Sequence, residues 1–155
     1  MSLLGLRRRQ REFRMLRQKI LTGENAPRFH AIIHEAALRP SMGDHELMRA
    51  QLLRLVEASR LPNVTLQILP FDGPIAFGTG FLMIEPRVAD LNMTLVSHVE
   101  QTLYLEDPAS IARYDEHFAR LEAMALAPID ATAAPETRIA KHSLGLIQRI
   151  LYPLL

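Results

Sequence analysis

The chain has 155 residues, of which 48% are hydrophobic, and this is enough to bury one core. It contains no cysteine, which excludes disulfides, thiolate metal sites and a cysteine nucleophile. No apolar run approaches the ~18 residues that span a bilayer, and the basic N-terminus lacks the features of a secretory signal, so we expect a soluble cytoplasmic protein.

The net charge of +1 conceals an asymmetry along the chain. Residues 7–19 hold seven basic groups and one acid, Glu12, whereas the remainder carries 11 basic and 16 acidic groups. A basic arm on an acidic body can contact nucleic acid or fold against its own body. We favour the second interpretation, because charge alone is a poor guide to DNA binding.

The first predicted element is a basic amphipathic helix, which we assign to residues 1–24 as a separate segment. Residues 3–21 lack proline and carry Leu6, Phe13, Leu16 and Ile20 at a spacing close to the helical period. Thr22 and Gly23 are expected to stop this helix.

A strand, a helix and a second strand are predicted next, over residues 28–35, 44–60 and 64–69. The first is rich in aromatic and branched residues, Asp44 can cap the helix, and Pro70 closes the second strand. Because the links are short, we expect the two strands to pair in parallel through a right-handed crossover.

Short strands, two helices and a linker account for the rest of the chain. After a glycine-rich loop we predict strands at 80–85, 91–99 and 102–105, which should pair antiparallel because no helix separates them. Asp107 and Pro108 start a helix over 108–126. Residues 125–135 are predicted to be a linker, followed by an amphipathic helix from about 136 to 151.

The expected fold class is therefore α/β (α+β mixed). We predict a mixed sheet with one parallel βαβ crossover and an antiparallel extension, with helices packed on it. The expected domain organisation is a basic helix over 1–24, a core domain over 25–127, and a linker with the C-terminal helix over 128–155.

Six motifs in order along residues 14–127 resemble those of a known family. They are Arg14, Arg17 and Gln18; Glu35, Ala36, Ala37, Leu38 and Arg39; Gly43, Met48, Gln51 and Leu52; Pro62, Asn63, Val64, Pro70 and Phe71; Gly80, Phe81 and the LYLE segment at 103–106; and Tyr114, Phe118 and Leu121. In these motifs the chain resembles the C-terminal domain of unknown function of actinobacterial XRE-type helix-turn-helix transcriptional regulators. The strand near 95–100 and the tail beyond 128 depart from the family pattern.

The resemblance implies the effector domain, for ligand sensing or assembly, of a bacterial DNA-binding transcriptional regulator. We expect no enzymatic activity and no cofactor, and we expect a homodimer. A helix-turn-helix unit needs several short helices, and one predicted helix precedes the first strand here. We therefore expect DNA to be contacted through a separate or missing helix-turn-helix domain.

The predicted ligand-binding residues are Glu35, Arg39, Phe71, Gly73 and Gly80. Glu35 ends the first strand, and parallel sheets bind ligands beyond the carboxyl ends of their strands. The glycine loop follows the second strand on the same rim, where it is either a lid over a small ligand or a wide hairpin turn. A ligand or partner protein bound here would shift the arrangement of the arginine helix.

Glu35 also has a structural interpretation. Its carboxylate can form an ion pair with Arg39, Arg14 or Arg17, which would tie the basic helix to the sheet. We assign Arg14, Arg17 and Gln18 a structural role on this basis.

Metal binding by His30 and His34 is not expected. On a strand these residues are separated by about 13 Å, which is too far for one ion to bind both.

Evidence in the sequence for catalysis is weak. Ser97 and His98 are adjacent on a strand and face opposite sides, and Glu100 and Glu106 are expected to be solvated surface carboxylates. Two alternatives remain open: a small hydrolase or nucleotide-processing enzyme in which Glu35, a histidine and Thr79 converge, or a pure dimerisation scaffold with an apolar interface on helix 136–151.

Overall fold

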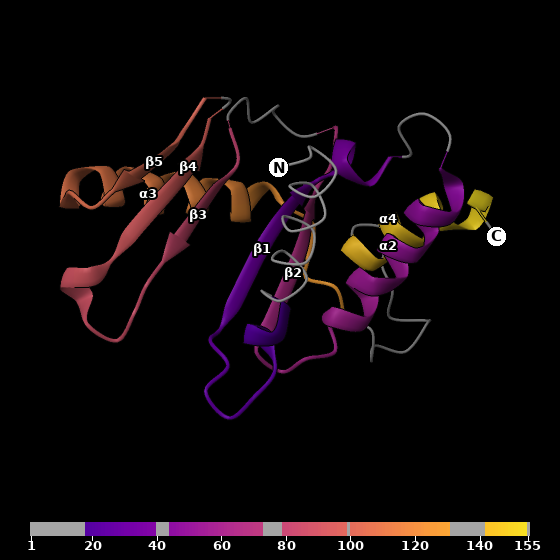
Figure 1. The fold of residues 1–155 in the computed structure, drawn as a ribbon. Coiled ribbons are helices and arrows are strands. Elements are labelled where there is room, and N and C mark those ends of the chain that lie inside the picture. Colours follow the sequence, from indigo (N-terminus) through magenta and orange to yellow (C-terminus); the bar gives the residue numbers. More distant parts are fainter. Residues whose placement is uncertain (1–17, 40–43, 73–78, 99, 131–141, 155) are drawn as a thin grey trace, which may run out of the picture. The chain divides into compact units, whose positions relative to one another are not determined.

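The computed structural model describes residues 18–39, 44–72, 79–98, 100–130 and 142–154 (Figure 1). It divides into two compact units. Unit 1 comprises Met1–Ile68 and Leu126–Leu155, and unit 2 comprises Leu69–Ala125. Each unit is described by itself below.

Unit 1 contains the predicted parallel strand pair. Strand β1 (Phe29–His34) is followed by the 3-10 helix η2 (Glu35–Leu38), the helix α2 (His45–Ala58) and strand β2 (Val64–Leu69). β1 and β2 form a two-stranded parallel sheet, and the backbone N–H of Phe29 donates to the carbonyl of Asn63 at 2.8 Å where the strands begin. The strand, helix and strand predicted from the sequence are confirmed.

The turns around these elements follow the local sequence. The 3-10 helix η1 (Gln18–Leu21) ends just before Gly23, whose φ of 135° is open to glycine but strained for other residues. The side chain of Asp44 accepts a hydrogen bond from the N–H of Leu47 at 2.9 Å and caps α2 as predicted. Of the predicted N-terminal helix, residues 3–17 lie outside the described residues.

The core of unit 1 lies between the sheet and two helices. Helix α4 (Ser143–Leu151), followed by the 3-10 helix η5 (Tyr152–Leu154), packs against α2. Leu52 of α2, Ile68 of β2 and Ile147 of α4 are each 0% exposed. The C-terminal helix predicted over 136–151 is confirmed for Ser143–Leu151, and residues 136–141 lie outside the described residues.

The prediction that residues 125–135 form a linker is wrong for the start of that segment. The N–H of Leu126 donates to the carbonyl of Ile68, and the N–H of Ile129 donates to the carbonyl of Leu66, each at 2.8 Å. Residues 126–129 thus run alongside β2, and Ile129 is 6% exposed. Four residues that include a proline show no periodicity, so only the tertiary hydrogen bonds reveal this packing.

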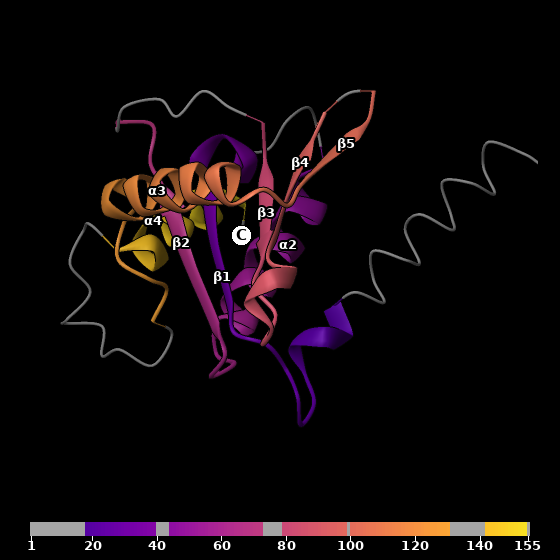
Figure 2. The same cartoon turned by 90° about the vertical axis from the view of Figure 1, so that its left-hand side faces the viewer.

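Unit 2 is an antiparallel sheet with one helix on it. Strands β3 (Phe81–Ile84), β4 (Met93–Ser97) and β5 (Thr102–Leu105) pair in that order, with the 3-10 helix η3 (Ala89–Leu91) between β3 and β4. Helix α3 (Pro108–Met124) packs on the sheet through β4, and the ring of Phe81 lies 5.0 Å from that of Tyr114. Figure 2 shows the three strands from a second direction. The predicted strands and helix of this region are confirmed.

The fold class predicted from the sequence, mixed α/β, is confirmed. The parallel pair and the antiparallel strands are both present, but they form two separate sheets where one mixed sheet was predicted. Sequence patterns identify strands and their nearest partners in the chain, whereas joining two sheets depends on long-range hydrogen bonds that leave no local pattern. Among the described helices, none is long and apolar enough to cross a membrane.

Replacing Ser143 by alanine tests how α4 is attached to β2. Ser143 is fully buried, and its Oγ accepts a hydrogen bond from the N–H of Ile68 at 2.9 Å and donates to the carbonyl of Leu126 at 3.4 Å. The Ser143→Ala variant leaves two buried backbone groups without this partner, so we expect a loss of about 1–3 kcal/mol in the free energy of unfolding. Urea denaturation measures it.

The matched control is Ser97→Ala, because Ser97 is exposed at the end of β4. We expect its free energy of unfolding to lie within about 0.5 kcal/mol of wild type. Equal stability of wild type and Ser143→Ala would contradict the role assigned to this hydroxyl.

The cap of α3 predicts a pH-dependent contribution to stability. Hydrogen bonds from the hydroxyl and backbone N–H of Ser110 lower the pKa of Asp107 below its usual 3.8. A carboxylate whose pKa falls on folding stabilises the folded state above its unfolded pKa, and this contribution is lost as the pH falls through the lowered value. We therefore expect Asp107→Ala to be less stable than wild type at pH 7, with a difference that shrinks below pH 3.8.

Thermal unfolding between pH 2 and pH 7, at roughly one-unit steps, follows this difference as the pH falls past the ordinary pKa of an aspartate. Asp115→Ala is the control, since Asp115 is an exposed carboxylate within the same helix. A difference between Asp107→Ala and wild type that is independent of pH would contradict the assignment.

Candidate functional site

The candidate site lies where β1 ends and the chain turns toward α2. The ring Nδ1 of His34, the last residue of β1, accepts a hydrogen bond from the N–H of Ala36 at 3.1 Å and caps η2. Arg39 follows η2 in extended backbone, with φ of -80° and ψ of 133°, and its side chain returns to that of Glu35 at the start of the turn. Leu38 of η2 is 4% exposed and belongs to the core of unit 1.

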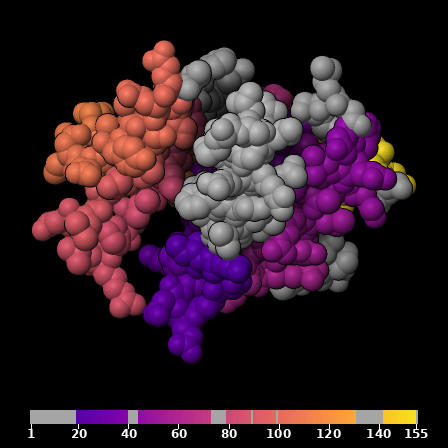
Figure 3. Space-filling model, viewed as in Figure 1, coloured from indigo at the N-terminus to yellow at the C-terminus, as the bar shows by residue number. Residues whose placement is uncertain are grey.

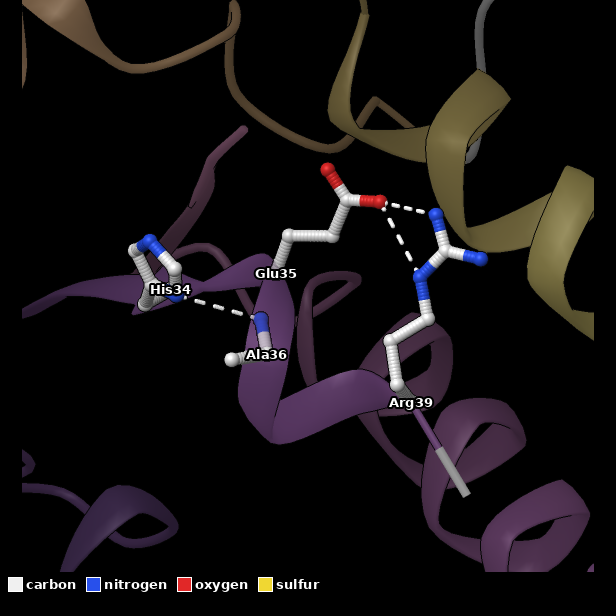
Figure 4. Close-up of polar contacts among 4 residues, drawn as sticks. All are labelled: His34, Glu35, Ala36 and Arg39. Carbon is white, nitrogen blue, oxygen red and sulfur yellow. Dashed lines mark hydrogen bonds and ion pairs between the residues drawn. The ribbon is translucent and has the colours of Figure 1, made fainter. Parts of the chain in front are cut away.

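Glu35 and Arg39 form an ion pair across this turn (Figure 4). Oε1 of Glu35 accepts hydrogen bonds from Nε of Arg39 at 3.1 Å and from its Nη2. The figure shows the carboxylate and the guanidinium turned toward each other, while the imidazole of His34 lies on the other side of the turn. The structural interpretation of Glu35, in which Arg39 is its partner, therefore describes the observed geometry.

The two partners differ sharply in exposure. The side chain of Glu35 is 5% exposed, whereas that of Arg39 is 56% exposed. A buried carboxylate is costly unless it is paired and hydrogen-bonded, so the guanidinium compensates for the burial of Glu35. More than half of Arg39 stays open to solvent, and its planar group of donors suits a carboxylate or phosphate.

The other predicted ligand-binding residues belong to unit 2. Phe71 follows β2 and is 47% exposed. Gly80 precedes β3, and a Cβ added at this position would meet no atom within 4 Å. Its carbonyl accepts a hydrogen bond from the N–H of Ser97 at 3.3 Å. Gly73 lies outside the described residues, so the lid role of the glycine loop stays a prediction.

The residues predicted to be structural are described only in part. Arg14 and Arg17 lie outside the described residues. Gln18 is the first residue of η1. The predicted ion pairs of Arg14 and Arg17 with Glu35 stay predictions, as does the structural role of Gln18.

The two histidines of β1 have separate roles. Nε2 of His30 lies 2.6 Å from Oε1 of Gln67, whereas His34 caps η2. Nε2 of Gln67 in turn donates to the carbonyl of Leu126 at 3.1 Å. In the part of the chain that the structure describes, no group of three or more histidine, aspartate and glutamate side chains is placed to hold a metal ion.

Two buried polar residues, Gln67 and Ser143, were not singled out from the sequence. Gln67 is 5% exposed although it alternates with the apolar residues Leu66 and Ile68, and Ser143 is 0% exposed. No sequence signal marks Gln67 as buried, since a polar residue that alternates with apolar ones is typical of a strand with one face open to solvent. No signal marks Ser143 either.

The residues considered for catalysis lie at the surface of unit 2. Ser97 and His98 are both exposed, and the N–H of His98 donates to the carbonyl of Gln101 at 3.0 Å in the turn after β4. Glu100 and Glu106 are exposed, as predicted for solvated carboxylates. Thr79 is also exposed, next to Gly80.

Comparison with known proteins identifies one family. The model of a family described as a domain of unknown function, DUF5753, matches residues 6–134, which is more than half of the chain. A search of curated proteins and a search of solved structures give no significant match. The chain therefore belongs to the DUF5753 family.

Proposed function

We propose that this chain is the effector domain of a bacterial DNA-binding transcriptional regulator. It acts in the cytoplasm, has no enzymatic activity, and contacts DNA through a separate helix-turn-helix domain. The proposal is supported by the motifs that resemble those of actinobacterial XRE-type regulators, among them Glu35 to Arg39 and the helix with Met48, Gln51 and Leu52. The observation that carries it is the solvent-exposed Arg39 held by the buried Glu35 at the end of β1.

The ligand that suits this site is a small anion with a carboxylate or phosphate group. Such a group would approach the exposed side of the Arg39 guanidinium and compete with Glu35 for its donors. Because Glu35 has little contact with water, weakening its ion pair would destabilise the present arrangement of η2. A ligand of this kind would shift the population toward the η2 conformation that it binds more tightly.

The core of unit 1 offers a physical connection from this site to the rest of the unit. Leu38 follows Glu35 in η2 and is buried in the same cluster as Leu52 of α2 and Ile147 of α4. A change in η2 would therefore alter the packing of both helices, because close-packed cores do not deform smoothly. This connection supports a sensing role in which binding at the surface changes how the unit contacts a partner.

Transcript profiling in the native host tests the regulatory function. We expect deletion of the gene and the Arg39→Gln allele to change the same set of transcripts, because both remove the proposed signal. The control allele is Arg54→Gln, since Arg54 forms a surface ion pair with Glu57 in which both side chains are about 60% exposed. Transcript levels that are unchanged by the deletion would contradict the proposed function.

Thermal unfolding of the same variants tests the site directly. Without added ligand we expect Arg39→Gln to lose about 1–3 kcal/mol in stability, since it removes the charged hydrogen bonds that the guanidinium gives to the buried carboxylate of Glu35. We expect Arg54→Gln to change stability by less than about 0.5 kcal/mol.

A panel of carboxylate and phosphate metabolites is then added to each variant. At a ligand concentration about 100 times its dissociation constant, wild type and Arg54→Gln should gain roughly 2.7 kcal/mol, while Arg39→Gln gains much less. Equal stabilisation of Arg39→Gln and wild type would place the ligand elsewhere.

A further inference from the structure

One face of the unit 2 sheet is apolar and exposed. The register pairs Leu82 with Leu95 and Leu95 with Tyr104, so these three side chains form a row across β3, β4 and β5 on the face opposite Phe81. Because Phe81 contacts the rings of α3, this row lies on the face that α3 does not cover. Leu82 is 46% exposed and Tyr104 is 63% exposed.

The apolar surface continues beyond the row. Ile84, on the same face as Leu82, is 43% exposed, and it pairs with Met93. The connection from β3 to β4 starts at this end of the sheet and carries Val88 and Leu91, which are 56% and 62% exposed. Contiguous exposed apolar surface of this kind indicates an interaction site. We call Leu82, Ile84, Met93, Leu95 and Tyr104 the open sheet face.

The charge of unit 2 indicates what binds this face. Residues 69–125 hold nine acidic and three basic residues, a net charge of −6 with histidines neutral. Glu85 and Glu106 are exposed at one end of the strands, and Glu100 is exposed in the turn at the other end. An apolar surface with acidic groups at both ends suits an amphipathic helix whose polar side is basic.

The sequence pattern of residues 6–20 predicts such a helix. Its apolar stripe is Leu6, Phe13, Leu16 and Ile20, and residues 7–19 carry a net charge of +6. If residues 6–20 are helical, this apolar stripe is about 21 Å long. A five-residue strand such as β4 is about 17 Å long, and the connection with Val88 and Leu91 extends the apolar surface beyond the strand. Charge and length therefore both match the open sheet face.

We propose that the open sheet face binds the basic amphipathic segment 6–20 of a second copy of this chain. A reciprocal exchange gives a two-fold dimer in which each copy supplies one segment and one face, so that two apolar faces are covered at once. Two such contacts favour a stable interface because the buried area doubles. This inference is independent of the regulatory function, since the assembly is measured on the chain alone.

Cross-linking between different copies tests the contact, and the absence of native cysteine makes it specific. One preparation carries Phe13→Cys and the other Tyr104→Cys, and the two are mixed with bismaleimidoethane. We expect a covalent dimer that contains one chain of each kind. Phe13→Cys mixed with Tyr152→Cys is the control, because Tyr152 is an exposed tyrosine of η5 outside the open sheet face, and it should give no such dimer.

Sedimentation velocity tests the energetic role of the face. We expect the wild-type chain to dimerise and Tyr104→Arg to weaken the dimer by about tenfold or more, since it places a cation where a basic helix binds. Tyr152→Arg should dimerise like wild type, and circular dichroism confirms that both variants are folded. A wild-type chain that is monomeric at all concentrations, or a dimer unaffected by Tyr104→Arg, would overturn the proposal.

Discussion

The structure of unit 1 depends on pairing the buried polar groups of β2. Five of the six residues of this strand are buried, so its backbone and side-chain polar groups have little access to water. Gln67 bonds with His30 and with the carbonyl of Leu126, and the N–H of Ile68 bonds with Ser143. Residues 126–129 pair with β2 carbonyls. These bonds connect β2 to β1, to the start of α4 and to a segment almost 60 residues later in the chain.

The same requirement explains the candidate site. Glu35 is buried at the first turn after β1 and is compensated by a guanidinium four residues later. The pair of Arg54 and Glu57 joins the same kinds of group, but both of its side chains are exposed to solvent, so it contributes little to stability. The pair of Glu35 and Arg39 differs from this surface pair because Glu35 is buried. Arg39 is exposed, so its guanidinium is accessible to a ligand.

Unit 2 presents a different balance. Its helix covers one face of the sheet through contacts such as that of Phe81 with Tyr114, and the opposite face keeps large apolar side chains in contact with solvent. Such a face is unfavourable for an isolated unit and favourable for association. The two units thus carry different kinds of surface feature: a buried ion pair with an exposed arginine in unit 1, and an apolar sheet face with acidic ends in unit 2.

The sequence by itself determined the elements and their caps. Asp44 and Asp107 mark the starts of α2 and α3, and alternation predicts β2, because these signals act within one turn or one strand. It also predicted Glu35 at the end of the first strand, one residue beyond the observed end of β1, and it contains the family motifs around this residue. Only the tertiary structure decided that the strands form two sheets, that residues 126–129 line β2, and that Gln67 and Ser143 are buried. These features depend on hydrogen bonds between residues far apart in the chain, and such bonds leave no periodic trace in the sequence.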